Sequence, residues 1–139
     1  MTLHLVKLAA RAQGIEDLVN WQQHVLATHG QVFHTTRMMP KRSAELLDGG
    51  SIYWVIKRKI RVRQEILDID PFVDNEGIKR CHIMLNPQLV ETRLQARRPF
   101  QGWRYLPAKD APADMPSGAE DDDELPEELK AELMALGLL

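Results

Sequence analysis

The segment from Ser51 to Ile69, with the sequence SIYWVIKRKIRVRQEILDI, constrains the fold more strongly than any other part of the chain. Its apolar residues alternate with polar ones, and successive side chains of a β-strand point to opposite faces of a sheet. β-branched and aromatic residues are frequent in it, which favours a strand, although apolar residues spaced four apart would also fit a helix. We therefore expect one long strand with an apolar face and a polar face.

The polar face of this expected strand would carry four cations in a row. They are Lys57, Lys59, Arg61 and Arg63. The alternation reverses beyond Glu65, because Leu67 and Ile69 are apolar at positions where the polar face should continue. A bulge or a sharp bend near Gln64–Ile66 would account for this reversal.

Local patterns predict the remaining elements of an α+β fold. Alternating or apolar runs indicate further strands at residues 2–9, 31–39, 78–85 and 90–95. Helical spacing indicates a helix from Ile15 to about His29, ended by Gly30, and a short helix after Pro40. We expect the sheet to be small and mainly antiparallel, with both helices in the N-terminal half of the chain.

The composition is that of an ordinary globular protein with one domain. The 139 residues are 44% hydrophobic and 27% charged, which is enough to build a core without disulfides or metals. No apolar run approaches the roughly 18 residues of a membrane span, and the N-terminus lacks the apolar stretch of a signal peptide. The single Cys excludes an internal disulfide. We expect a cytoplasmic protein with no membrane contact.

The net charge of −2 conceals a basic body and an acidic tail. Residues 1–109 contain 17 Lys and Arg against 10 Asp and Glu, a net charge of +7, whereas residues 110–139 contain one Lys against 10 acids, a net charge of −9. This division is typical of proteins that contact polyanions, although it is not specific to them. We expect one α+β domain over 1–109, an acidic flexible linker over 110–124 and an amphipathic helix over 125–139.

The expected C-terminal helix carries an apolar stripe. Pro126 suits its first turn. The stripe consists of Leu125, Leu129, Leu133 and Leu136. A helix of this length is marginal in water unless it docks on another surface. We expect it to dock on its own domain or on a symmetry mate, and the second choice would make a homodimer.

The segment ARRPFQGWRYL, residues 96–106, interleaves arginines with aromatic rings. Such cations can contact phosphates while the rings stack on bases. The alternative is a closing strand whose aromatic side chains, Phe100 and Tyr105 above all, fill one end of the core. Together with the basic strand, this segment completes a set of candidate residues for binding nucleic acid. They are Arg37, Tyr53, Trp54, Lys57, Lys59, Arg61, Arg63, Arg97, Arg98, Gln101, Trp103 and Arg104.

Four segments resemble an uncharacterised bacterial family that is defined only as a domain of unknown function. They are LHLVKL, GGSIYWVIK, RRPFQGWRYL and PEELKAELMALGLL, and together they extend over nearly the whole chain. The resemblance implies a glycine at the position of Arg58 in many members, which would suit a bulge. It implies no activity.

The order of the expected elements also resembles that of PUA-like domains of the ASCH and EVE kind. A short helix, a glycine turn, an aromatic strand and a long bent strand that runs into ILDI carry this likeness. The likeness implies a small pseudo-barrel that binds RNA or modified bases. It also implies a pocket near Arg37, Tyr53, Trp54 and Lys57.

Metal sites and catalytic sites find no support in the sequence. His24 and His29 do not share a helical face, and the neighbours Cys81 and His82 would point to opposite sides of a strand. No Cys pair and no HExxH motif is present to hold zinc. We expect no metal, no cofactor and no catalytic residue, and we expect Cys81 to be a small buried side chain.

Three functions remain open from the sequence alone. The first is a binding module for a nucleic acid, with RNA or a modified base or nucleotide as its ligand and the basic strand as its phosphate contact. The second is an enzyme or binding protein for a small anionic metabolite, and the third is a protein–protein adaptor. Salt dependence separates the first two, because several phosphate contacts make affinity fall steeply with salt.

Overall fold

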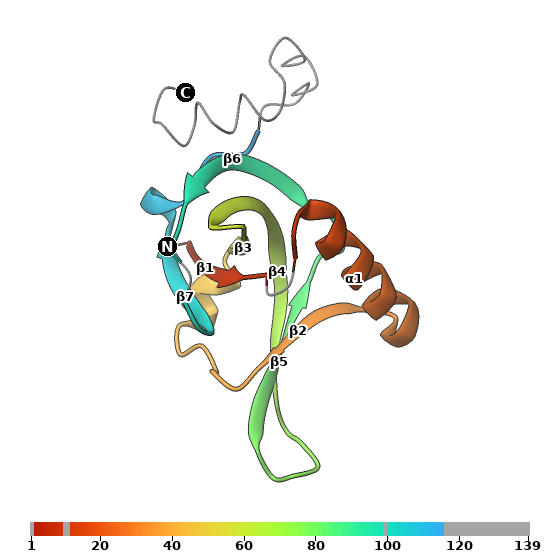
Figure 1. Cartoon of the computed structure of the whole chain (residues 1–139). Coiled ribbons are helices and arrows are strands. Elements are labelled where there is room, and N and C mark those ends of the chain that lie inside the picture. The colour runs from red at the N-terminus through yellow and green to blue at the C-terminus, as the bar shows by residue number, and fades with distance from the viewer. Residues whose placement is uncertain (1, 10–11, 99, 116–139) are drawn as a thin grey trace.

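The chain forms a sheet-rich α+β fold, which we describe from a computed structural model. The structure describes residues 2–9, 12–98 and 100–115 (Figure 1). In chain order the elements are β1 (Leu3–Leu8), α1 (Ile15–His29), β2 (Val32–Thr36), α2 (Ser43–Leu46), β3 (Ser51–Ile56), β4 (Lys59–Val73), β5 (Lys79–Leu85), β6 (Val90–Ala96), β7 (Trp103–Pro107) and the 3-10 helix η1 (Ala108–Asp110). The two helices predicted in the N-terminal half and most of the predicted strands are confirmed.

The sheet is built around β4, which is 15 residues long. Its first part pairs with β3 on one edge and with β6 on the other, and its second part pairs with β5. The strand order is β2-β5-β4-β3-β1-β7, with β6 beside β4 and off this path. All pairs are antiparallel except β1 with β3, which is parallel.

The sheet is open, which differs from the pseudo-barrel expected from the PUA-like resemblance. Among the described strands, β2 pairs with β5 alone and β7 pairs with β1 alone, so the two end strands do not meet. The bend of β4 explains the gap, because it carries β5 and β2 away from β1 and β7 (Figure 1). The mainly antiparallel sheet is confirmed, and the pseudo-barrel is not supported.

The segment from Ser51 to Ile69 is two strands rather than one. Lys57 and Arg58 have φ values of 52° and 68°, and Ile56 lies directly opposite Lys59 across the turn. Two central residues with positive φ define the type I′ turn, whose twist matches that of a β-hairpin. The prediction of a single long strand is therefore wrong, because the chain reverses at Lys57-Arg58.

Two irregularities bend β4 after this turn. Val55 pairs with Ile60 while Trp54 pairs with Val62, so the residue between them, Arg61, has no partner on β3. A second shift in register lies between Ile66 and Asp68, in the pairing with β5. The second shift is close to the predicted bend. The first one has a larger effect, because a bulge of one residue reverses which face the following side chains occupy.

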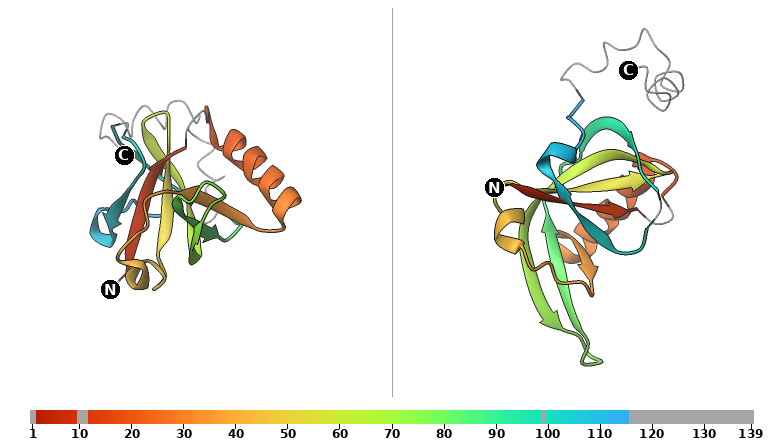
Figure 2. Two further views of the ribbon diagram at one scale, coloured as in Figure 1. Left: turned by 90° about the horizontal axis from the view of Figure 1, so that it is seen from below. Right: turned by 90° about the vertical axis from the view of Figure 1, so that its left-hand side faces the viewer.

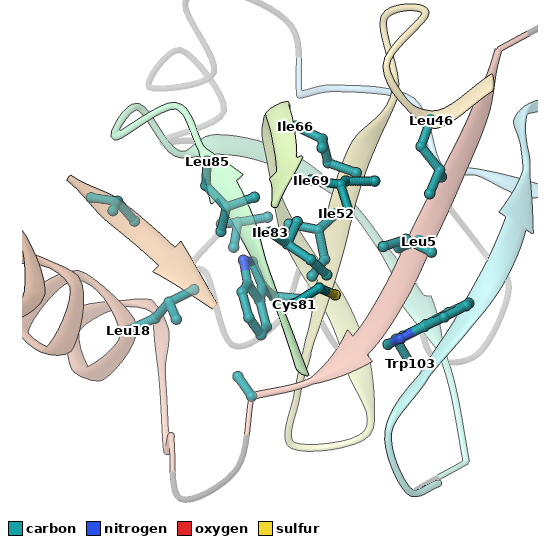
Figure 3. Close-up of a cluster of buried hydrophobic side chains, with 14 of the residues drawn as sticks. Leu5, Leu18, Leu46, Ile52, Ile66, Ile69, Cys81, Ile83, Leu85 and Trp103 are labelled. Carbon is teal, nitrogen blue, oxygen red and sulfur yellow. The ribbon is translucent and has the colours of Figure 1, made fainter. Parts of the chain in front are cut away.

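Both faces of the sheet are buried around β3, all six residues of which are buried. One face packs into the larger core, where side chains from β1, β3, β4, β5, β7 and α1 meet (Figure 3). This cluster includes Leu5, Leu18, Ile52, Trp54, Val62, Ile83 and Trp103. The other face holds a smaller cluster, made of Val6, Tyr53, Val55, Ile60 and Leu106. Phe100 and Ala111 cover the smaller cluster from the chain beyond β6.

Two glycines allow the chain to enter β3 from α2. Gly49 has a φ of 81°, a left-handed conformation that few other residues adopt. Gly50 passes so close to the backbone oxygens of Leu3 and Leu46 that a side chain would collide with both. The predicted turn at this Gly-Gly pair is confirmed, and it places β3 directly beside β1.

The chain beyond η1 returns to the sheet. Arg93 N donates to Ala113 O at 2.8 Å, and Met115 N donates to Glu91 O at 2.9 Å. Residues 113–115 therefore pair with β6, although the sequence pattern predicted a flexible linker there. The rest of that linker and the whole of the expected docking helix, residues 116–139, lie outside the described residues. No helix in the described part of the chain is long and apolar enough to cross a membrane.

The type I′ turn gives a first prediction about stability. We expect Arg58→Gly to raise the free energy of unfolding by about 1 kcal/mol, because a left-handed conformation costs an ordinary residue about 1–2 kcal/mol and glycine adopts it freely. Urea denaturation measures the change. Arg93→Gly is the control, because Arg93 lies in a strand and glycine there should destabilise. A loss of stability in Arg58→Gly would contradict the assigned turn.

Candidate functional site

The four cations predicted to share one face of a strand do not do so. Lys59 lies opposite Ile56, whose side chain belongs to the larger core cluster, whereas Arg63 lies opposite Tyr53 in the smaller cluster. Directly paired residues project from the same face of a sheet, so Lys59 and Arg63 are on opposite faces. The bulge at Arg61 causes the reversal, and Lys57 lies in the turn. The expected basic stripe along the strand is therefore wrong.

Arg63 takes part in an ion pair that fixes the end of the described chain. Its Nε and its Nη2 donate to the two carboxylate oxygens of Asp114, each at 2.7 Å, and its Nη1 donates to Ser51 Oγ at 3.0 Å. The hydrogen bond from Arg63 lowers the pKa of the Asp114 carboxyl, and the same bond raises the pKa of Arg63. This geometry makes Arg63 a structural residue that anchors residues 113–115 beside β6.

The Arg63–Asp114 pair predicts a pH-dependent contribution to stability. We expect Asp114→Asn to lower the free energy of unfolding at neutral pH by about 0.5–1 kcal/mol, since both side chains are partly exposed to solvent. A lowered pKa in the folded state means that the contribution is complete above about pH 4 and is lost as pH falls through the folded pKa. Denaturation at neutral and acidic pH tests this, and a difference that stayed constant with pH would contradict it.

The aromatic residues predicted to stack on bases are buried. Tyr53, Trp54 and Trp103 are 4%, 2% and 6% exposed. The indole N–H groups are occupied as well, because Trp54 donates to Gln64 Oε1 at 2.8 Å and Trp103 donates to Met38 O at 2.7 Å. Their burial leaves no open ring face for a base, which corrects the expectation of stacking at these three positions.

Phe100 and Tyr105 pack against the core, as the alternative interpretation of the segment 96–106 predicted. Phe100 is half-buried on the smaller cluster and Tyr105 on the larger one. The Tyr105 hydroxyl accepts hydrogen bonds from the backbone N–H groups of Lys41 and Arg42, at 2.9 and 3.2 Å. Tyr105 therefore also holds the entry to α2 in place.

Cations gather around a hollow between the end of β6, the connection to β7, β7 itself and η1. We call it the arginine hollow. It has a volume of about 790 Å³, and its charged lining consists of Arg97, Arg98, Arg104, Lys109 and Asp110. Gln95, Ala96 and Phe100 complete the lining. Figure 2 shows β7 and η1 on the same side of the molecule as the end of β6. Three of the predicted site residues meet here, namely Arg97, Arg98 and Arg104.

Backbone and side-chain contacts hold the walls of the arginine hollow. Arg97 N donates to Arg58 O at 2.7 Å, which places the type I′ turn beside the hollow. Gln95 Nε2 donates to Asp110 O at 3.0 Å and joins β6 to η1. The guanidinium of Arg104 lies 5.2 Å from the centre of the Phe100 ring, a cation–π contact that limits its movement. These contacts position Arg97, Arg104 and η1 around the hollow.

The charge in the arginine hollow is not balanced within the described residues. Four cations face one carboxylate, Asp110, and no ion pair within the described ranges involves any of the four. Like charges that share a concave site raise its electrostatic potential and attract anions. Arginine is suited to such a ligand, because its planar guanidinium binds phosphate through two parallel hydrogen bonds.

The remaining predicted site residues lie elsewhere. Arg37 and Gln101 are exposed and do not line the arginine hollow, and Arg61 Nε is buried with no hydrogen-bond partner in the described residues. Trp54 lines a pocket, but its neighbours there include Lys7 and His34 rather than the residues implied by the PUA-like resemblance. Sequence reasoning missed Lys109, since a single lysine after a strand carries no pattern that distinguishes it.

Metal binding and thiol chemistry have no visible basis in the described part of the chain. No group of three or more His, Cys, Asp or Glu residues within it could hold a metal ion. Cys81 is buried in the larger core cluster, as predicted, and burial raises the pKa of its thiol (Figure 3). A buried thiol with a raised pKa is a poor nucleophile.

Fold and site together define a small, sheet-rich α+β protein with a cationic hollow beside its sheet. The chain belongs to the family described as protein of unknown function (DUF1489), whose match covers residues 5–139. This confirms the resemblance to a domain of unknown function. No curated protein and no solved structure matches the chain. Function must therefore be argued from the site.

Proposed function

We propose that this protein binds the phosphate backbone of a single-stranded nucleic acid in the arginine hollow. The observation that carries the proposal is the gathering of Arg97, Arg98, Arg104 and Lys109 around one cavity that contains a single acid. A concave, positively charged groove that follows the backbone is the usual means of binding single strands without reading their sequence. A single-stranded RNA is the first ligand to test.

The contacts in this proposal are to phosphates and not to bases. The arginines and Lys109 would each contact a phosphate oxygen, and the turn at Lys57-Arg58 lies close enough to extend the positive surface. The rings of Tyr53, Trp54 and Trp103 are buried and offer no stacking surface. We therefore expect little preference for sequence and a strong dependence on salt.

Fluorescence anisotropy with a labelled uridine oligomer of about 12 nucleotides tests the proposal, since single-strand sites span roughly 4–16 nucleotides. We expect Arg97→Gln/Arg98→Gln to weaken binding more than tenfold at low salt, and to reduce the slope of log K against log salt by about 1.4, which is 0.7 for each of the two cations removed. The control is Lys41→Gln/Lys79→Gln, which changes the net charge equally at exposed positions outside the hollow.

Three results would contradict the proposal. Equal reductions in affinity in the hollow variant and in the control would mean that net charge alone drives binding. Affinity for a mononucleotide equal to that for the oligomer, with a shallow salt slope, would favour the alternative of a small anionic metabolite. An adaptor function predicts no oligomer binding at all.

A further inference from the structure

A second pocket opens on another part of the molecule, between the end of β1, the start of α1, β2 and β3. It has a volume of about 370 Å³. Its lining includes Lys7, Asp17, Leu18, Trp21, His34 and Trp54. None of these residues lines the arginine hollow. This pocket is large enough for a small organic molecule, and its walls are mostly apolar, as in many ligand sites.

The walls favour a flat ligand. Two indoles line the pocket, and that of Trp21 is 46% exposed although it is a large apolar group. The ring of Trp54 meets the ring of His34 edge-on, at 5.8 Å between centroids. Leu8, Ala12 and Leu18 supply the remaining apolar surface. An aromatic ring placed among these groups would remove apolar surface from water and gain edge or stacking contacts.

One cation in this pocket lacks an anionic partner. Lys7 is half-buried, and within the described residues its ammonium has a single hydrogen bond, a long one of 3.5 Å to Leu8 O. Burial lowers the pKa of Lys7, because the ammonium is partly removed from water. Asp17 does not relieve this charge, because its carboxylate accepts from Gln13 N at 2.7 Å and no ion pair joins it to Lys7 in the described part of the chain.

We propose that this pocket binds a small planar aromatic molecule that carries one carboxylate, with the ring against the exposed indole of Trp21 and the carboxylate on Lys7. The ligand's charge would supply the partner that Lys7 lacks, and its ring would fill the apolar space. His34 supplies an uncharged wall and adds no second cation at neutral pH, because burial, with Lys7 nearby, lowers its pKa to about 4. This inference is independent of the nucleic-acid proposal.

Isothermal titration with 2-naphthoate and with its neutral analogue 2-naphthalenemethanol tests the inference. We expect naphthoate to bind the wild-type protein about tenfold more tightly than the alcohol, the difference that one charge-assisted hydrogen bond provides. Lys7→Met should remove this preference and leave binding of the alcohol unchanged. Lys41→Met, at an exposed lysine outside the pocket, is the control and should bind both probes as the wild type does.

A second variant keeps the test decisive if Lys7→Met fails to fold. Trp21→Ala removes an exposed side chain, so the fold should persist while both probes bind more weakly. The inference would be overturned if 2-naphthoate showed no saturable binding to the wild-type protein. It would also be overturned if Lys7→Met kept the preference for the anion, or if Trp21→Ala bound both probes as tightly as the wild type.

Discussion

Replacing Gln64 with Met is expected to lower the free energy of unfolding by about 4 kcal/mol, because two or three buried polar groups would be left without partners at once. Gln64 is 0% exposed. Its Oε1 accepts from Trp54 Nε1 at 2.8 Å and from Gln22 Nε2 at 2.6 Å, and its Nε2 donates to Gln22 Oε1 at 2.7 Å and to Asn86 O at 3.0 Å. This single side chain links α1, β3, β4 and the loop after β5.

Urea denaturation measures the effect of this substitution. Gln23→Met is the matched control, because Gln23 is an exposed neighbour of Gln22 on α1 and should tolerate the change within about 0.5 kcal/mol. The double variant Gln22→Leu/Gln64→Leu should lose less free energy of unfolding than the two single variants lose together. Each single variant leaves the other glutamine's amide buried without its partner, whereas the double variant removes both amides. If Gln64→Met lowered the free energy of unfolding by less than about 1 kcal/mol, the buried hydrogen-bond network around Gln64 would be contradicted.

His34 should make the protein sensitive to mild acid. Burial lowers the pKa of His34 from its ordinary value of 6.5 to about 4, and the positive charge of Lys7 is the second cause of this shift. The unfolded chain takes up a proton near pH 6.5 while the folded one resists it. The linked stability is therefore complete above pH 6.5 and is lost progressively until about pH 4. A difference of this size corresponds to about 3 kcal/mol.

Comparison of the wild type with His34→Phe isolates this effect, because the other titrating groups are the same in both proteins. We expect the wild type to lose about 3 kcal/mol more than the variant between pH 7 and pH 4, as measured by denaturant unfolding. Phenylalanine keeps an aromatic ring against Trp54. Parallel stability curves for the two proteins over this range would show that His34 protonates freely in the folded state.

Elements were predictable from the sequence where the signal is local. The helix from Ile15 to His29 follows from its apolar spacing, and Gly30 ends it with a φ of 72°, the conformation that glycine favours. The turn at residues 74–77 and the strand after it follow from similar patterns. Each of these depends on interactions within a few residues, which the sequence displays directly.

The hairpin and the bulge were not predictable, because they oppose local preferences. Type I′ turns favour Asn-Gly, and Lys57-Arg58 gives no such signal. The bulge at Arg61 is visible only once β3 and β4 are paired. The alternating pattern therefore looked continuous, although the chain reverses and then changes face.

The candidate site was predictable in part. The cluster of arginines in residues 96–106 pointed to the arginine hollow, but Lys109 and Asp110 join it only through the path of the chain after β7. The Gln22–Gln64 pair had a signal of another kind, since each glutamine interrupts an apolar face. Their contact across 42 residues could not be inferred from either position alone.

Amide chemical-shift mapping by NMR, with the uridine oligomer added at low salt, locates the surface that binds the nucleic acid. Binding in the arginine hollow predicts that the largest changes fall on residues 95–98, 104 and 109, which surround it, with smaller changes at Lys57 and Arg58. Added salt should reverse them. Changes centred on another surface, such as the pocket around Lys7 and His34, or no change at all, would contradict nucleic-acid binding in the arginine hollow.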